Sequence, residues 1–382
     1  MKRRQFLAHT SALAVGASSV VLISHASAQN KDDAVVVGCT AALSGPLGSL
    51  GMGMKAGVDA AFSQINAQGG VNGRTVRFDV LDDAYVPARS VENVRKLLGD
   101  SNVVALMGCL GTPNNAAITP VVEEAGITHL APLTGAASLR RSDFRHLFHV
   151  RASYTDEIQR LVGSLVSMGI KDLAVVHLDN PYGREVLEDA VKAMTQVGIK
   201  AVATVALATD GANMESVLAA IKQAKPSAVL LGTAGAATTA LVAGLRKQST
   251  MLPIAGVSAS LTQDGIRQLG GLVQGVGLTT VFPDPWQAKH KLVRDYQAAM
   301  TAMGARTFDS GSLEGYVNAR IMVEALTRAG KGAGREKVRQ GVASIRNLDL
   351  GGFSVDYSPA AGRVGSKYVG LGILGADGRL KV

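Results

Sequence analysis

Runs of apolar, often β-branched residues alternate along the chain with segments whose apolar residues recur every three or four positions. The first run, 35–43, reads as a strand buried on both faces. Apolar residues from Met54 to Ile65 then follow a helical period, and Gly69 ends that helix because glycine tolerates the left-handed C-cap. The next predicted strands are 75–81, 103–107 and 127–131, and the helices between them are 88–98 and 113–124.

The same alternation resumes after Phe148. Strand–helix–strand order at this spacing is typical of parallel sheets covered by helices, so two such blocks predict an α/β protein with two doubly wound parallel-sheet lobes. No linker separates the blocks, and we expect the chain to cross between the lobes more than once, leaving a cleft between them. The predicted elements are strands 173–177, 201–205, 228–231, 254–257, 276–281, 352–357 and 368–374, and helices 156–168, 183–196, 214–222, 237–247, 285–303 and 310–328.

The first thirty residues have the pattern of an export signal. Basic residues at 2–4 precede a stretch, 5–30, without any charged residue, and a small-residue motif predicts cleavage between Ala28 and Gln29. The apolar stretch is too short and too diluted for a transmembrane anchor. The paired arginines also resemble a twin-arginine signal, which leaves the export route open. We expect residues 1–28 to be a signal peptide and the mature protein to be periplasmic.

Composition excludes several classes of protein. Of the 382 residues, 47% are hydrophobic, which excludes a disordered chain, and 2 cysteines are too few for a disulfide scaffold or a zinc module. The formal charge of +9 falls to +6 once the three basic residues at 2–4 are removed. With few aromatic residues and no long Lys/Arg run, this charge argues against a nucleic-acid partner.

Neither the cysteines nor the histidines predict a covalent or metal site. Cys39 and Cys109 follow glycines at the ends of neighbouring predicted strands, and side-by-side positions on parallel strands fit disulfide geometry poorly. We therefore expect two buried thiols. His146 and His149 are the only close histidine pair and lack further donors, so we expect no metal.

Three loops that follow strands of the first block carry small or hydroxylated residues just before a helix. They contain Ser44, then Thr112 with Pro113, then Thr134 with Gly135. Such positions offer backbone N–H groups and hydroxyls to a polar or anionic ligand. N-capping explains any one of them, but their convergence on one sheet edge makes a binding site an equally good explanation.

At these loops the chain resembles the type I periplasmic solute-binding proteins, the branched-chain amino-acid receptor family of ABC importers. The resemblance implies two lobes, joined by three crossovers, that close on a small-molecule ligand and present it to an inner-membrane ABC permease. It implies no cofactor, no catalysis and a monomeric mature protein. The motifs that carry it are Leu43-Ser44-Gly45-Pro46, the Gly-Gly-x-x-Gly turn within 65–73, the pair Asp82-Asp83, and the runs 108–132 and 177–183.

The resemblance also implies a division into lobes and a set of ligand contacts. Lobe 1 is expected at 32–148 plus 283–350, and lobe 2 at 149–282 plus 351–382. Thr112, Leu133 and Gly135 fall on the positions that bind the ligand carboxylate. Second-lobe contacts fall near Tyr154, Tyr182, Ala234 and Ser258.

Three positions depart from the family pattern, and at two of them, Ala234 and Leu50, amino-acid-binding members often have an aromatic residue. Amino-acid-binding members have an acidic residue where this chain has Ser258, and that acid holds the ligand's ammonium group. A buried ammonium without a counter-charge costs several kcal/mol. The expected solute is therefore a small carboxylate- or amide-bearing molecule (an amino acid, an amide or an organic acid), and recognition of an α-ammonium stays open.

Two other functional classes are compatible with parts of the sequence, a cofactor-dependent enzyme and a ligand-sensing regulator. Gly51, Gly53 and Gly57 superficially match a dinucleotide fingerprint, so the alternative is an exported cofactor-dependent oxidoreductase. These glycines come too far after the strand, and helix packing is the plainer explanation. A ligand-sensing regulator would need a DNA-binding or partner element that we do not identify. Arg151 could neutralise an anionic ligand, although we expect it to be solvated near the lobe boundary.

Overall fold

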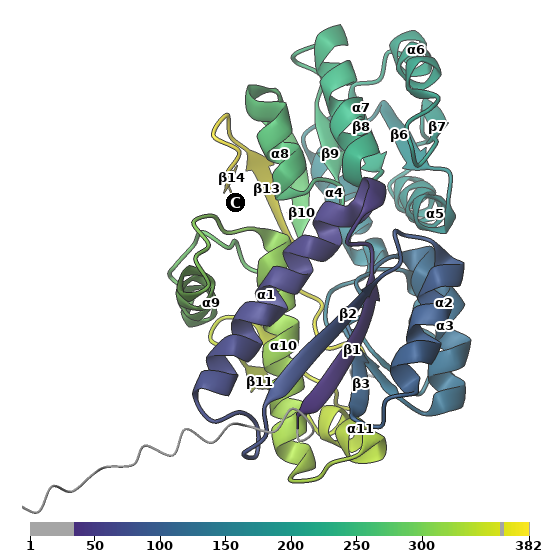
Figure 1. Ribbon diagram of the computed structural model, residues 1–382. Coiled ribbons are helices and arrows are strands. Elements are labelled where there is room, and N and C mark those ends of the chain that lie inside the picture. Colours follow the sequence, from purple (N-terminus) through teal and green to yellow (C-terminus); the bar gives the residue numbers. More distant parts are fainter. Residues whose placement is uncertain (1–33, 360–362, 382) are drawn as a thin grey trace, which may run out of the picture.

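The computed structural model describes residues 34–359 and 363–381, so the predicted signal peptide lies outside the described residues. Two larger sheets lie one above the other in Figure 1. The first has five strands, all parallel, in the order β2-β1-β3-β4-β5. Its strands are β1 (Val35–Ala41), β2 (Val76–Asp82), β3 (Val103–Met107), β4 (Thr128–Leu130) and β5 (Leu147–Phe148).

The second sheet has seven strands in the order β14-β13-β10-β9-β8-β6-β7. Five of them are parallel, and the last two, β13 and β14, extend the sheet in antiparallel fashion. Its strands are β6 (Leu173–Leu178), β7 (Ala203–Leu207), β8 (Ala228–Gly232), β9 (Ile254–Gly256), β10 (Val276–Thr280), β13 (Gly370–Leu374) and β14 (Leu380–Lys381). A small antiparallel pair consists of β11 (Leu348–Asp349) and β12 (Ser354–Val355).

Helices from both ends of the chain cover the first sheet. α1 packs along α10, and α11 contacts α10, β3 and β4, so the C-terminal helices return to the N-terminal sheet (Figure 1). The helices on this side are η2 (Gly45–Leu47), α1 (Gly48–Ala67), α2 (Pro87–Leu98), α3 (Thr112–Ala125), η3 (Ala137–Leu139), α9 (Lys291–Ala302), α10 (Ser310–Ala329) and α11 (Arg335–Ala343).

The helices of the second sheet come from the middle of the chain. They are α4 (Tyr154–Ser167), α5 (Pro181–Gln196), α6 (Met214–Ala224), α7 (Gly235–Gln248), α8 (Gln263–Leu269) and η4 (Gly270–Val273). The chain passes between the sheets three times, after β5, after β10 and between α11 and β13. This is the predicted α/β fold with two parallel-dominated sheets. Within the described ranges, no helix combines the length and apolarity needed to cross a membrane.

Local chemistry explains where several of these elements begin. β1, β3, β6 and β8 are buried along their whole length, as continuous apolar runs predict for central parallel strands. Ser153 and Asp156 form a capping box at the start of α4. Asp309 caps α10 by accepting a hydrogen bond from the Ser312 N–H at 2.9 Å, which holds the first turn of that helix in place.

The structure differs from the predicted elements at a few boundaries. The helix predicted for 285–303 begins only at Lys291, because Asp284 turns the chain by accepting a hydrogen bond from the Trp286 N–H at 3.0 Å. β7 lies two residues later than the predicted strand 201–205. The short helix α8 was not predicted, since seven residues are too few to show a helical period.

The glycines that imitate a dinucleotide fingerprint lie within α1. A Cβ on Gly51 would lie 2.0 Å from the Ala42 carbonyl oxygen, and one on Gly57 would lie 1.8 Å from the Ser312 carbonyl oxygen. These glycines therefore allow close packing against the strand end and α10, rather than forming a phosphate-binding turn. Cys39 and Cys109 are free, buried thiols, as predicted.

Candidate functional site

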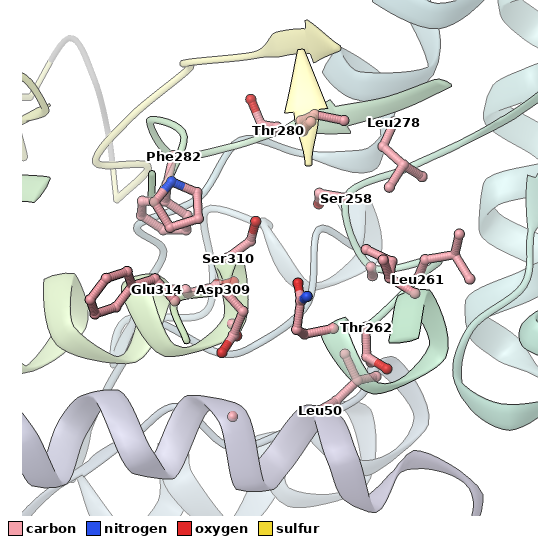
Figure 2. Close-up of a pocket in the computed structure, with 18 of the residues that line it drawn as sticks. Leu50, Ser258, Leu261, Thr262, Leu278, Thr280, Phe282, Asp309, Ser310 and Glu314 are labelled. Atoms are coloured by element: carbon pink, nitrogen blue, oxygen red, sulfur yellow. The ribbon is translucent and has the colours of Figure 1, made fainter. Parts of the chain in front are cut away.

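A cleft of about 310 Å³ opens between elements of the two sheets. One side consists of the first turns of α1 and α10, and the other of β10, the loop after β9 and the start of α8 (Figure 2). The crossover after β10 and the turn between β13 and β14 complete it. Because lining residues come from both sheets, a change in the relative position of the lobes would change the shape of this cleft.

Most of the cleft wall is apolar. Aliphatic and aromatic side chains from both lobes face the space, which suits the non-polar part of a small organic molecule. Trp286 packs edge-on against Phe308 at 5.1 Å between ring centroids, and the Arg379 guanidinium lies 4.7 Å from the Trp286 ring. The apolar lining residues include Leu50, Leu133, Leu261, Ile266, Leu278, Val281, Phe282, Trp286, Phe308 and Leu374.

A buried group of charged residues forms one end of the cleft. Arg151, on the crossover after β5, lies 3.5 Å from a carboxylate oxygen of Glu157 in α4 and 3.5 Å from one of Glu314 in α10. Arg151 is 2% exposed, and it also donates a hydrogen bond to the Ser258 hydroxyl. The Arg151 guanidinium therefore joins α4, the loop after β9 and α10, which are distant from one another in sequence.

Both carboxylate oxygens of Glu157 have partners. Its Oε2 accepts from the Ser258 N–H at 2.7 Å and from the Thr279 hydroxyl at 2.5 Å, while its other oxygen faces Arg151. Glu157 thus serves to hold the loop after β9 and the end of β10 in place.

Burial sets the electrostatics of the other two groups. Burial raises the pKa of Glu314, Arg151 opposes this rise, and Glu157 adds to it. Burial alone would lower the pKa of Arg151, but Glu314 and Glu157 raise it above its usual value. Arg151 therefore keeps its charge, whereas burial disfavours the charged form of Glu314.

Two of the predicted site residues line the cleft. Leu133, at the end of the loop after β4, and Ser258, after β9, both face it. Ser258 uses its hydroxyl to accept from Arg151 and its N–H to donate to Glu157, which explains how a serine fits beside these charges. As ligand contacts, both stay predictions.

The other predicted residues on the two lobes form a buried contact region next to the cleft. The hydroxyls of Thr112 and Thr134 are hydrogen-bonded to each other at 2.7 Å, and the Gly135 carbonyl accepts from the Tyr154 N–H at 2.8 Å. Pro113, the second residue of α3, is half-buried. In this conformation, then, the hydroxyls of the predicted carboxylate site bind each other.

On the second lobe the aromatic residues lie in the same region. The rings of Tyr154 and Tyr182 meet edge to face with centroids 5.2 Å apart, and the Tyr182 hydroxyl donates to the Thr233 carbonyl at 3.4 Å. Ala234 is buried directly before α7. The structure thus brings the residues predicted on different strands together, although side chains rather than open space fill the centre of the group.

Ser44 lies apart from this group. It is exposed, and its hydroxyl donates to Asp82 at 2.6 Å, joining the loop after β1 to the end of β2. Burial would raise the pKa of Asp82, but hydrogen bonds from Ser44, Leu43 and Ala84 lower it to about 2. The observed role of Ser44 is therefore to fix a loop.

Sequence reasoning missed the charged end of the cleft. Arg151 was expected to be solvated, and this is wrong because Glu157 and Glu314 enclose it. The available signal was an acidic residue interrupting the apolar face of each of two helices, α4 and α10. Such an interruption marks a buried charge but does not identify its partner.

Comparisons with known proteins agree with this architecture. A model of the family described as periplasmic binding protein matches residues 34–371. The amino acid binding protein of Pseudomonas aeruginosa is 26% identical over 330 residues, 84% of each chain. The Leu/Ile/Val-binding protein homolog 2 of Brucella abortus is 24% identical over 301 residues, 78% of this chain and 79% of the relative. The crystal structure of a substrate-binding periplasmic protein from Ralstonia solanacearum aligns with a TM-score of 0.86 at 28% identity, over 91% of this chain and 99% of that chain.

Proposed function

Because the chain belongs to the periplasmic binding protein family, we propose that it is the substrate-binding component of an ABC transporter. In this function it captures a small solute between its lobes by a hinge motion and delivers it to an inner-membrane permease. The observation that carries the proposal is the cleft, where an apolar wall and a few buried polar groups from both lobes face one space. That combination is what small-molecule sites require.

The proposal includes the division into lobes and the place of action. Lobe 1 comprises 32–148 plus 283–350, and lobe 2 comprises 149–282 plus 351–382. The packing of α10 on α1 and the joining of β13 to β10 support this division. The signal peptide is 1–28, and the mature protein acts as a monomer in the periplasm.

The solute in this proposal is a small carboxylate- or amide-bearing organic molecule. One relative carries the name amino acid binding protein, which puts amino acids first among the candidates. Capture requires neither a cofactor nor a chemical step, since lobe closure alone buries the solute.

A thermal-shift screen of the mature protein, starting at Gln29, tests this function. The panel contains amino acids, aliphatic amides, aromatic and dicarboxylic acids, short peptides and nicotinamide cofactors. A ligand at about 100 times its Kd adds about 2.7 kcal/mol to the free energy of unfolding, which raises Tm by a few degrees. Mass spectrometry of the bound fraction then shows whether the ligand is chemically unchanged.

A shift from one solute class, with the ligand recovered unchanged, supports the transport function. No shift from any solute, a shift from a nicotinamide cofactor alone, or a ligand that is recovered altered would contradict it.

A further inference from the structure

The charged group at the end of the cleft has an unequal balance of charges. Two carboxylates, Glu157 and Glu314, approach the single guanidinium of Arg151. Both acids are buried, and Glu157 has no exposed surface. When both are ionised, these three residues carry one negative charge in excess. The next buried guanidinium, Arg140, interacts with Asp156 and Glu157, whereas the charges acting on Glu314 are those of Arg151 and Glu157. A buried, uncompensated charge is costly, and a ligand of opposite charge would remove that cost.

Glu314 is the acid that faces the cleft. It lies in the second turn of α10, lines the cleft and is 7% exposed (Figure 2). Its contact with Arg151, at 3.5 Å, is longer than a normal charge-assisted hydrogen bond. Among the described residues no hydrogen bond to its carboxylate is present, so its acceptor positions are available to a ligand.

The other acids of the cleft are already engaged. Asp309 accepts from the N–H and the hydroxyl of Ser312, at 2.9 and 2.8 Å, and caps α10. Asp264 pairs with Arg267, and Asp284 accepts from the Trp286 N–H. Of the four acids that line the cleft, Glu314 is therefore the one whose carboxylate accepts no hydrogen bond from the described residues.

The surroundings of Glu314 favour one kind of ligand group. A ligand carboxylate would be repelled by Glu314 and would have to displace Glu157 or Glu314 to reach Arg151. A protonated amine would supply both the missing positive charge and the hydrogen-bond donors. The apolar wall around Leu50, Leu261 and Phe282 then suits the rest of the molecule.

We propose that Glu314 is the residue that binds a protonated amine in the cleft, and that the solute carries this amine next to an apolar body. This inference rests on the proposed function. It also accounts for Ser258, because the acid expected at that position in lobe 2 is replaced by an acid from α10 in lobe 1. The counter-charge thus comes from the opposite wall of the same cleft.

Matched probes that differ only in the charged group test this inference. The first set is 2-phenylethylamine, 3-phenylpropanoate and the neutral 3-phenylpropanamide. The second is L-leucine, 3-methylbutylamine and 4-methylpentanoate. Isothermal titration calorimetry of the mature protein gives Kd for each. We expect the amine-bearing probe of at least one set to bind roughly tenfold or more tightly than its carboxylate counterpart.

The Glu314→Gln variant assigns the preference to one residue. Its affinity for the amine should fall by roughly tenfold or more, while the carboxylate probe should bind as well as before or better, because the repulsion is gone. A variant that had merely lost its structure would lose both probes. Glu314→Asp should retain part of the amine preference. Glu324→Gln, the same change in an exposed part of α10, is the control and should leave both affinities unchanged.

Several outcomes would overturn the inference. These are equal binding of the amine and the carboxylate by the wild type, undiminished amine binding by Glu314→Gln, and an absence of binding for every amine-bearing probe. In the last case the wider solute screen separates the two proposals. A shift from an acidic or neutral solute would retain the transport function while rejecting the role of Glu314, whereas an empty screen would reject both.

Discussion

Glu157 and Glu314 contact the same guanidinium, but the protein treats them differently. Glu157 in α4 accepts hydrogen bonds from Ser258 and Thr279, so its carboxylate is fixed by the fold. Glu314 in α10 has Arg151 at 3.5 Å, and burial raises its pKa. At the residue scale, the charged group therefore contains one acid that holds neighbouring segments in place and one whose charged form is disfavoured by burial. A group of the second kind is typical of binding sites, where stability is exchanged for function.

We predict that Glu314→Gln is more stable than the wild type near neutral pH, and that the difference disappears in acid. A glutamate with a raised pKa in the folded state contributes stability that is fully present below its ordinary pKa and is lost as the pH rises through the folded pKa. Glutamine cannot ionise, so the variant escapes this loss. Each unit by which the pKa is raised adds about 1.4 kcal/mol to the difference.

Urea unfolding of both proteins at about pH 4 and about pH 8 measures this effect. The charged groups facing Glu314 are Arg151 from the crossover and Glu157 from α4, and Asp309 lies one turn away on α10. All three are present in both proteins, so the difference isolates Glu314. A difference that stays constant, or shrinks as the pH rises, would contradict the prediction.

At the scale of elements, the contact between α1 and α10 sets the width of one wall of the cleft. The two helices cross with their backbones in contact at Gly57 and Gly315. A Cβ at Gly57 would lie 1.8 Å from the Ser312 carbonyl oxygen, and one at Gly315 would lie 2.0 Å from that of Met54. Glu314, next to Gly315, and Leu50, about two turns before Gly57, both line the cleft, so this helix contact positions the binding surface.

We predict that Gly57→Ala lowers the free energy of unfolding by about 2 kcal/mol, within the range for overpacked interiors. Alanine is favoured over glycine in a helix by about 1 kcal/mol, but the new methyl group would meet backbone atoms that cannot rotate away. Chemical denaturation measures the change.

Gly163→Ala is the matched control. Gly163 lies inside α4 and is exposed, and a Cβ there would have no atom within 4 Å. Only helix propensity acts at this site, so we expect a stabilisation of up to about 1 kcal/mol. If Gly57→Ala proved equally stabilising, the close contact between α1 and α10 would not be a constraint.

At the scale of the whole molecule, the lobes touch at a point away from the crossovers. Pro46 and Leu47 in η2, after the first strand of one sheet, pack against Gly235 at the start of α7 in the other lobe. Gly235 has a φ of +71°, and a Cβ there would lie 2.4 Å from the Pro46 carbonyl oxygen. Ser49 and Thr262 also share a hydrogen bond of 3.4 Å across the lobes. This contact holds the lobes in close approach.

We predict that Gly235→Ala forces the lobes apart. The radius of gyration of the ligand-free mature protein should increase in small-angle X-ray scattering. Affinity for the solute found in the screen should fall by roughly tenfold, because closure now meets a steric barrier. The measurement is a direct comparison of variant and wild type by scattering and calorimetry.

Gly198→Ala separates this effect from backbone strain. Gly198 has a φ of +74°, but a Cβ there would have no atom within 4 Å. Both variants should lose about 1–2 kcal/mol of stability through the left-handed conformation. Only Gly235→Ala should change the radius of gyration and the affinity. If the two variants behaved alike, η2 and α7 would not control lobe closure.

Part of the candidate site was predictable from local sequence. The loops after parallel strands meet at one sheet edge, so Thr112, Thr134 and Gly135 lie together, as their positions suggested. The open part of the cleft was not predictable in this way. It lies beside these loops, toward α1, α8 and α10, because the Thr112 and Thr134 hydroxyls bind each other and Tyr154 packs against Gly135.

The alternation of strands and helices, and with it the two sheets, could be predicted from the chain because it depends on the spacing of apolar residues among near neighbours. The contact among residues 151, 157, 258 and 314 follows from the folded arrangement alone, as does the absence of a described hydrogen bond to the Glu314 carboxylate. These positions are up to 163 residues apart, from 151 to 314. Their contact depends on how the three crossovers place the two lobes, and the local spacing of apolar residues does not predict it.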